Sequence, residues 1–177
     1  MRFRALKADE IDVRIGGVYK AGMTLLLYKN ARVDMQILDE SVGEFNWQRD
    51  HKEIKGNLYC GIGINSGCEW VWKWDCGTES FSEKEKGEAS DSFKRAGFNW
   101  GIGRELYTAP FIWLPVATKL KGNGKGYELN DPNEVKGIYV SDFATRETDG
   151  KRVITKLVLS QNAYKKPVEI YRWEEKI

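Results

Sequence analysis

Histidine, cysteine and proline are scarce in this sequence, and no long apolar run is present. The single histidine leaves few ligands for a zinc site, and the three cysteines, Cys60, Cys68 and Cys76, do not form Cys-x-x-Cys pairs. We therefore expect neither a disulfide framework nor a zinc knuckle. No apolar run reaches the 18 residues typical of a membrane span, and no cationic and apolar leader is evident, so we expect a cytoplasmic protein without membrane contact.

Excess charge of one sign is also missing. The 28 basic and 26 acidic residues leave a formal net charge of +2, which is too small to attract a polyanion by itself. Any contact with nucleic acid must therefore come from local clusters of Lys and Arg. The seven tryptophans are unusual, and core or subunit packing explains them better than base stacking does.

The first hundred residues alternate between strand and helix patterns. Residues 11–28 contain two β-prone runs around the turn "YKAGM", which predicts a hairpin. Asn30 and Gly43 are suited to cap the two ends of a helix between them. The runs "FNWQRDHKEI", "NLYCGIGIN" and "CEWVWKWDCG" then predict an antiparallel meander, because their side chains alternate and their connections are short.

A long helix is predicted over residues 82–107. Apolar residues recur along it at helical spacing, but Gly97, Gly101 and Gly103 each cost roughly 1 kcal/mol relative to alanine in a helix interior. Close approach of another backbone would explain why side chains are missing there.

The remaining residues differ in composition. Residues 119–134, "KLKGNGKGYELNDPNE", predict a loop, and "VKGIYVSDFATRE", "KRVITKLVLS" and "PVEIYRWEEKI" predict a second β unit. The fold class we predict is α+β: an antiparallel sheet made of a hairpin, a helix and a three-stranded meander, packed by a long helix and followed by a C-terminal β appendage. We expect a core over residues 8–108 and a β extension over residues 109–177.

Basic residues follow one edge of the predicted long helix. Lys86, Lys94, Arg95 and Arg104 are spaced so that they can meet successive phosphates of an extended strand. The alternative is a solvated helix face on which these cations pair with neighbouring carboxylates. The hairpin adds Arg14 and Lys20 around the glycine-rich run "IGGVYKAG", which either admits a ligand or forms an ordinary flexible tip.

Catalytic and nucleotide-binding motifs are not evident. "GFNWGIG" does not open a helix directly after a strand, and the sequence contains no "GK[ST]" motif. In "RDHKE", Asp50 faces away from His51 and Glu53 on a strand, which disfavours a metal or acid/base site. A nuclease built around Asp50 and Glu53 is kept as a third hypothesis. The first two, described below, involve binding of single-stranded DNA without catalysis.

The segment "KGEASDSFKRAGFNWGIGRELY", preceded by "FNWQRDHKEI", "NLYCGIGI" and "EWVWKWDCG", resembles the single-strand annealing proteins of the Rad52 superfamily. It is most similar to their small bacteriophage relatives of the Sak type. The resemblance covers roughly residues 10–107, and "SDSFKRA" followed by "GIGRELY" is its most specific part.

This resemblance implies an oligomeric ring or arc that holds single-stranded DNA in a basic groove between the long helix and the hairpin. The DNA-contacting positions would be Lys86, Lys94, Arg95 and Arg14. Phe98 stands where eukaryotic members carry a third basic residue, and Arg104 is a candidate substitute. The expected partners are single-stranded DNA, further copies of the chain and a host or phage single-strand-binding protein.

The function we predict is annealing of complementary strands in homologous recombination and DNA repair. It requires no bond-making step, no cofactor and no metal, so we do not expect an enzyme. The alternative is a protein that protects single-stranded DNA without annealing it and stacks bases on aromatic residues such as Trp70 or Trp72.

Overall fold

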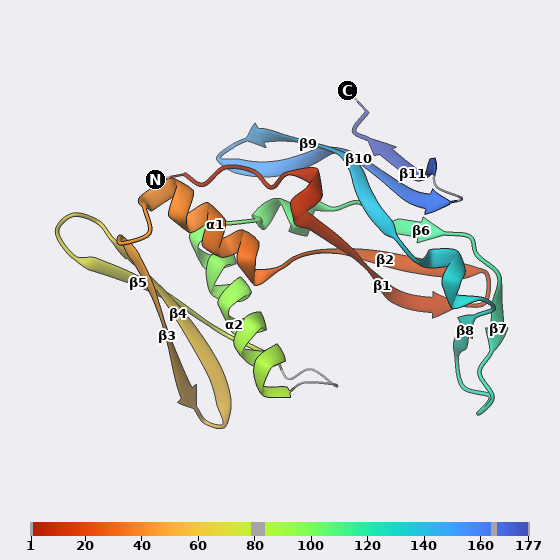
Figure 1. Ribbon diagram of the computed structural model, residues 1–177, viewed down its shortest axis with the longest axis horizontal. Coiled ribbons are helices and arrows are strands. Elements are labelled where there is room, and N and C mark those ends of the chain that lie inside the picture. Colours follow the sequence, from red (N-terminus) through yellow and green to blue (C-terminus); the bar gives the residue numbers. More distant parts are fainter. Residues whose placement is uncertain (1, 79–83, 164–165, 177) are drawn as a thin grey trace. The chain divides into compact units, whose positions relative to one another are not determined.

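The computed structural model describes residues 2–78, 84–163 and 166–176, which cluster into two compact units. Neither unit is continuous in the sequence: the first consists of Met1–Leu6 and Lys29–Arg104, and the second of Lys7–Tyr28 and Glu105–Ile177. The strands β2 to β11 pair with their neighbours in antiparallel fashion, and the described residues include two α-helices (Figure 1). This composition agrees with the predicted α+β class.

The first unit begins with helix α1 (Ala31–Val42), as the sequence predicts. The Asn30 side chain accepts hydrogen bonds from the backbone N–H groups of Arg32 and Val33, which satisfies two donors that have no partner within the helix. Gly43 forms the C-terminal cap. Ile37 and Leu38 are completely buried, so α1 contributes one apolar face to the core of this unit.

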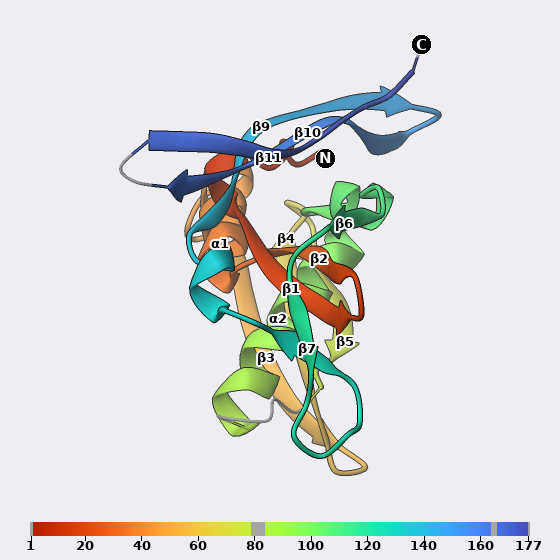
Figure 2. The same cartoon turned by 90° about the vertical axis from the view of Figure 1, so that its right-hand side faces the viewer.

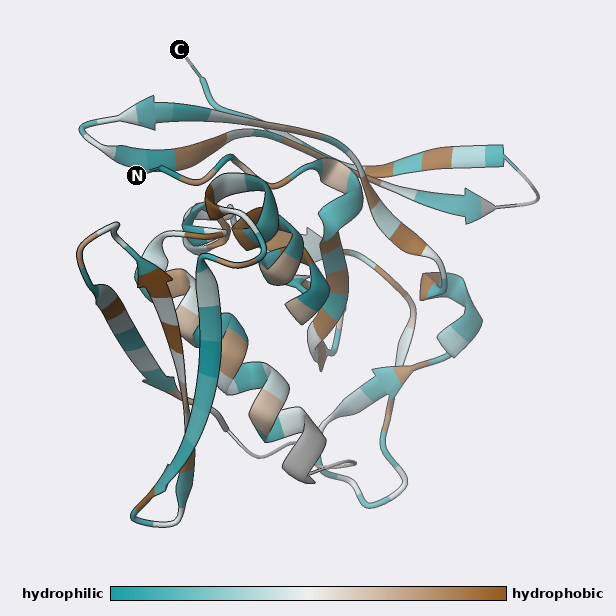
Figure 3. Ribbon diagram, turned by 60° about the vertical axis from the view of Figure 1, so that its left-hand side comes forward, coloured by the Kyte–Doolittle hydropathy of each residue, from teal (hydrophilic) through white to brown (hydrophobic). Residues whose placement is uncertain are grey.

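The predicted meander is present as β3 (Trp47–Ile54), β4 (Asn57–Asn65) and β5 (Trp70–Cys76), in the order β3-β4-β5. One face of β4 buries Cys60, Ile62 and Ile64. Helix α2 (Lys84–Trp100) packs against β4 and β5 (Figure 1). Hydrophobic and hydrophilic residues alternate along α2, as Figure 3 shows, and Phe93 and Ala96 are buried.

The opposite face of the meander carries two tryptophans that lie over glycines. The strand register places Trp74 opposite Gly61 and Trp72 opposite Gly63. A Cβ at Gly61 would lie 2.5 Å from the Trp74 ring, and a Cβ at Gly63 would lie 2.7 Å from the Trp72 ring. The two indoles stack with their centroids 5.6 Å apart. The "GIG" of β4 therefore accommodates aromatic rings.

The prediction that one helix extends from residue 82 to residue 107 is wrong at its C-terminal end, and residues 82 and 83 lie outside the described residues. The backbone N–H of Gly101 donates to the carbonyl of Phe98, and that of Ile102 donates to the carbonyl of Gly97. These two bonds form a Schellman motif, and Gly101 has the positive φ of 102° that the motif requires. Residues Arg104–Thr108 form a separate 3₁₀-helix, η2.

The second unit contains the predicted hairpin, but in a sheet separate from the meander, whereas the sequence predicted one sheet for both. Strands β1 (Ile11–Tyr19) and β2 (Gly22–Lys29) form a sheet with β6 (Ile112–Leu114) in the order β1-β2-β6, and a short 3₁₀-helix, η1 (Ala8–Glu10), precedes β1. One face of this sheet buries Met23, Leu25, Ile112 and Leu114.

The strands predicted for the C-terminal β appendage are also present and form one sheet. It consists of β9 (Ile138–Thr148), β10 (Lys151–Ala163) and β11 (Lys166–Glu174), with β10 in the centre (Figure 2). The segment 119–134, predicted to be a loop, instead contains most of a small hairpin, β7 (Thr118–Leu120) and β8 (Tyr127–Leu129), followed by η3 (Pro132–Val135). Three-residue strands are too short to produce a recognisable hydrophobic period.

The expected division into an annealing core over residues 8–108 and an extension over residues 109–177 stays a prediction. Among the described residues, neither α-helix has the length and apolar character needed to cross a lipid bilayer.

Candidate nucleic-acid interface

Lys94 and Arg95 both lie on α2, and both have carboxylate partners. Lys94 Nζ is 3.8 Å from Asp91 Oδ1 one helical turn earlier, and its side chain is 17% exposed. Arg95 Nε lies 3.2 Å from Asp75 Oδ1 of β5, and its side chain is 44% exposed. These pairs agree with the alternative of a solvated helix face more closely than with two free cations. An incoming phosphate would have to replace the carboxylates.

A buried ion pair lies directly beneath this part of α2. Lys29, at the end of β2, pairs with Asp34, in the first turn of α1, and both side chains are at most 1% exposed. Lys29 Nζ also donates to the carbonyl oxygen of Lys94 at 3.2 Å and lies 4.2 Å from the centroid of the Phe98 ring. This pair joins Lys29 and α1 to the helix that carries Lys94 and Arg95.

Burial raises the pKa of Asp34 from 3.8 to about 6, although attraction to Lys29 and to Lys94 opposes the rise. Two glycines make room for the pair: a Cβ at Gly97 would collide with Asp34 Oδ1, and one at Gly103 would lie 2.7 Å from the Lys29 side chain. The absent side chains therefore admit a buried ion pair, and not a neighbouring backbone as predicted.

Arg104 does not continue a row of cations along the helix, because α2 ends at Trp100. Its Nε donates to the carbonyl of Phe98 at 2.6 Å, and a terminal nitrogen donates to that of Asn99 at 2.8 Å. The guanidinium thus caps the C-terminus of α2, where a cation also complements the helix dipole. A direct DNA contact by Arg104 stays a prediction.

Lys86 lies within α2, but its side chain is outside the described part of the structure. The four helix-associated candidates, Lys86, Lys94, Arg95 and Arg104, belong to the first unit.

The two hairpin candidates belong to the second unit. Arg14 of β1 is exposed, and its guanidinium carbon lies 4.9 Å from the centroid of the Tyr28 ring on β2. Lys20 lies in the turn between the strands with an exposed side chain, while its carbonyl oxygen accepts a hydrogen bond from Thr118 Oγ1 at 2.8 Å. Both side chains are therefore available to solvent while the backbone that carries them is held in place.

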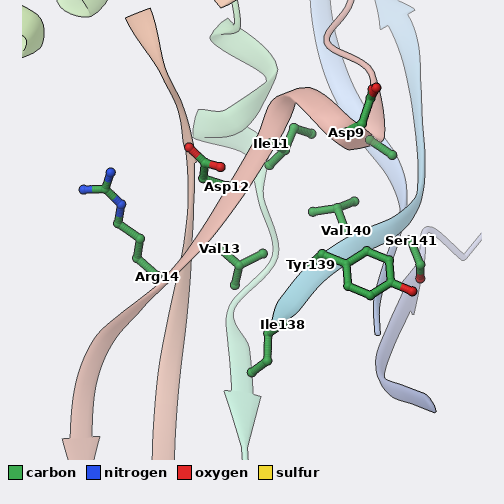
Figure 4. A pocket seen from close by; sticks show the side chains of 10 residues that line it. Asp9, Ile11, Asp12, Val13, Arg14, Ile138, Tyr139, Val140 and Ser141 are labelled. Carbon is green, nitrogen blue, oxygen red and sulfur yellow. The ribbon is translucent and has the colours of Figure 1, made fainter. Parts of the chain in front are cut away.

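A hollow between β1 and β9 includes Arg14 in its lining. Figure 4 shows Ile11, Val13 and Val140 between the two strands, with Arg14 extending to the other side of β1. Arg14 therefore does not point into the hollow.

The structure also locates the residues of the nuclease hypothesis and of the base-stacking hypothesis. Asp50 is paired with Gly61 and His51 with Cys60, so their side chains lie on opposite faces of the meander. Within the described ranges, no group of three metal-ligating side chains is close enough to hold a cation. Trp72 is half-buried against Trp74, whereas Trp70 is 39% exposed.

The sequence prediction missed two features. Lys29 and Asp34 gave no separate signal, although Gly97 and Gly103 indicated a close approach. It also missed an exposed aromatic row on the hairpin sheet, Tyr19, Trp113 and Phe111, because Phe111 and Trp113 alternate with equally apolar residues.

Comparison with known proteins gives one match. Residues 53–123 match the family described as Rad52/22 family double-strand break repair protein. No curated protein and no solved structure matches the chain. The matched segment starts at the end of β3 and includes β4, β5 and α2, so it contains Lys94, Arg95 and Arg104 but not the hairpin. The part of the chain from the last residues of β3 through α2 to β7 is therefore similar to the Rad52/22 family of double-strand break repair proteins.

Proposed function

We propose that this chain binds single-stranded DNA and anneals complementary strands during recombination and repair. The observation that carries the proposal is the Rad52/22 match over residues 53–123, which includes the helix that bears Lys94 and Arg95. The assignment to the phage Sak type is part of the same proposal.

Phosphate binding by the cations of α2 is the central step of this function. Lys94 and Arg95 are neighbours on one helix, and each already binds an oxygen anion, the carboxylate of Asp91 or of Asp75. A phosphate offers the same kind of acceptor, and Arg binds it in a planar, bidentate geometry. Contacts to phosphates leave the base edges open to a complementary strand, as annealing requires.

Oligomerisation is part of the proposal because one chain offers few contacts. A ring or arc of identical subunits repeats the same phosphate contacts along a strand and increases affinity through effective concentration. Arg14 and Lys20 of the hairpin supply further exposed cations. No step in this function makes or breaks a covalent bond, and a single-strand-binding protein is the expected additional partner.

The test is the double variant Lys94→Ala/Arg95→Ala. We expect it to lose binding to single-stranded DNA while oligomer size and helix content stay unchanged. Where residual binding is measurable at low salt, the slope of log K against log salt concentration should be shallower by about 1.4, since each single-strand phosphate contact contributes about 0.7. Fluorescence anisotropy over a salt series measures the slope. Native mass spectrometry measures oligomer size, and circular dichroism measures helix content.

The matched control is Lys136→Ala/Lys151→Ala, which removes two exposed cations from the second unit. Both double variants lower the net charge equally, so a general charge effect would weaken binding to the same extent. Retained binding by the α2 variant, or equal loss in both variants, would contradict the assignment of the site.

A further inference from the structure

Three aromatic side chains form a row on one face of the β1-β2-β6 sheet. The ring centroids of Tyr19 and Trp113 are 5.8 Å apart, and those of Phe111 and Trp113 are 6.4 Å apart with nearly parallel planes at 16°. Tyr19 is 51% exposed and Phe111 is 76% exposed. The row lies within the second unit and differs from the Trp72 and Trp74 pair of the meander.

The sheet holds this row in place. Trp113 pairs with Thr24 of β2, and Ile112 and Leu114 on either side of it point to the buried face. A Cβ at Gly22 would lie 2.8 Å from the Trp113 indole, and a Cβ at Gly17 would lie 2.9 Å from the Tyr19 hydroxyl. The glycines of "IGGVYKAG" therefore allow aromatic rings to lie close to the sheet, so the hairpin is not merely a flexible tip.

The two segments that carry the row contain cations but no carboxylates. Residues 13–28 contain Arg14 and Lys20 and no carboxylate, and residues 106–127 contain Lys119, Lys121 and Lys125 and no carboxylate. The hydrogen bond from Thr118 to the carbonyl of Lys20 holds the start of β7 against the hairpin turn. Lys119 pairs with Glu128 at 3.5 Å but stays 57% exposed, and Lys121 and Lys125 are exposed.

We propose that Tyr19, Trp113 and Phe111 form a stacking platform for unpaired bases of the single strand, whose phosphates contact Lys20 and the lysines of the β7–β8 hairpin. Exposed rings beside a cationic rim are the combination that single-stranded nucleic acid requires, because every base has a π-face and every nucleotide a phosphate. This inference rests on the proposed function and adds a second contact region to it.

The charge pattern favours bases over a second copy of this chain as the occupant. The two segments that carry the row contain five cations and no carboxylate. A copy of the same surface would place these like charges close together, whereas a polyanion complements them.

The test compares the double variant Tyr19→Leu/Phe111→Leu with Tyr19→Phe/Phe111→Tyr. The first keeps apolar side chains but removes the π-faces, and the second keeps both rings. Trp113 is left unchanged because it packs over Gly22. The probes are oligothymidylate and an abasic oligonucleotide of equal length, which carry the same phosphates and differ in their bases.

We expect the unaltered protein to bind oligothymidylate about 5- to 100-fold more tightly than the abasic strand, as base–aromatic stacking implies. The leucine variant should lose most of this preference without weaker binding to the abasic strand, and the aromatic variant should keep it. A preference that survives in the leucine variant, or is absent from the unaltered protein, would overturn the platform while leaving phosphate binding intact.

Two other outcomes are informative. If the leucine variant changes the native mass but not the preference, the row packs against a second copy and the inference is wrong. If the unaltered protein binds neither strand in a salt-dependent manner, the proposed function itself fails.

Discussion

The buried ion pair beneath α2 gives the sharpest test of how this structure is stabilised. Gly97 lies in the helix, so substitution by alanine would stabilise an ordinary helix by about 1 kcal/mol. Here the new methyl group would collide with Asp34 Oδ1. Asp34 is completely buried and pairs with Lys29, so the carboxylate has no solvent to move into.

The expected cost follows from two opposing contributions. Separating a buried ion pair costs about 3–5 kcal/mol, because it leaves charges without partners in a region of low polarity. Subtracting the helix preference of about 1 kcal/mol leaves a net loss of about 2–4 kcal/mol in the free energy of unfolding. Gly97→Ala should therefore destabilise the protein despite its favourable propensity.

A second background isolates the cause. In Lys29→Met/Asp34→Ala, both charges are absent and the space of the carboxylate is open, so the same Gly97→Ala change should stabilise by about 1 kcal/mol. Urea unfolding followed by far-UV circular dichroism gives all four stabilities of the cycle. The difference between the two backgrounds is the coupling, expected at about 3–5 kcal/mol.

Two results would refute this reasoning. Stabilisation by Gly97→Ala in the unaltered protein would mean that the carboxylate moves away without cost. An equal loss in both backgrounds would mean that the methyl group meets something other than Asp34.

The remaining predictions concern cysteine reactivity, the glycines beneath tryptophan and the helix cap. Burial raises the pKa of Cys60 to about 11, so its thiolate is scarce at pH 8. A thiol reagent should therefore modify the exposed Cys68 rapidly, but Cys60 only near pH 11 or after unfolding. Peptide mapping of the modified protein measures both rates. Gly61→Ala should lower the free energy of unfolding by about 1–3 kcal/mol because its Cβ would lie 2.5 Å from an indole, whereas Gly122→Ala, with no atom within 4 Å, should change it by less than about 0.5 kcal/mol. Arg104→Ala should cost about 1 kcal/mol by removing two hydrogen bonds to carbonyls at the end of α2, each of which keeps one other donor, and unchanged thermal stability would exclude a capping role.

Local patterns predicted the elements whose signals lie within a few residues. Asn30 and Gly43 bound α1 because caps act within one helical turn, and the alternation through Trp70, Trp72 and Trp74 predicted β5 because strand residues alternate between two faces. These predictions needed no information about distant parts of the chain.

The prediction for the C-terminal end of α2 was wrong because a glycine in a helical pattern can either lie inside the helix or end it. Apolar spacing continued beyond Trp100, so Gly101 and Gly103 were interpreted as costly interior residues. In the structure Gly101 ends the helix, since only a residue that tolerates positive φ completes the Schellman motif. Arg104 was wrongly predicted to lie within this helix for the same reason.

The candidate site depends on contacts between distant residues, which sequence spacing does not reveal. The helical edge predicted that Lys94 and Arg95 would be accessible cations, but Asp75 comes to Arg95 from a different strand. Asp34 stands in the first turn of its helix, where carboxylates are usually solvated, and its burial depends on Lys29 and on α2.

The discontinuous second unit has a consequence for biosynthesis. Its hairpin, residues 11–28, is translated early, but its sheet partner β6 begins at Ile112 and the strands β9 to β11 follow later still. At about 5–20 residues per second, the hairpin waits several seconds before the residues that cover its buried face exist. During that interval Met23 and Leu25 lack their partner strand β6, so slow codons between residues 29 and 111 should increase aggregation of this protein.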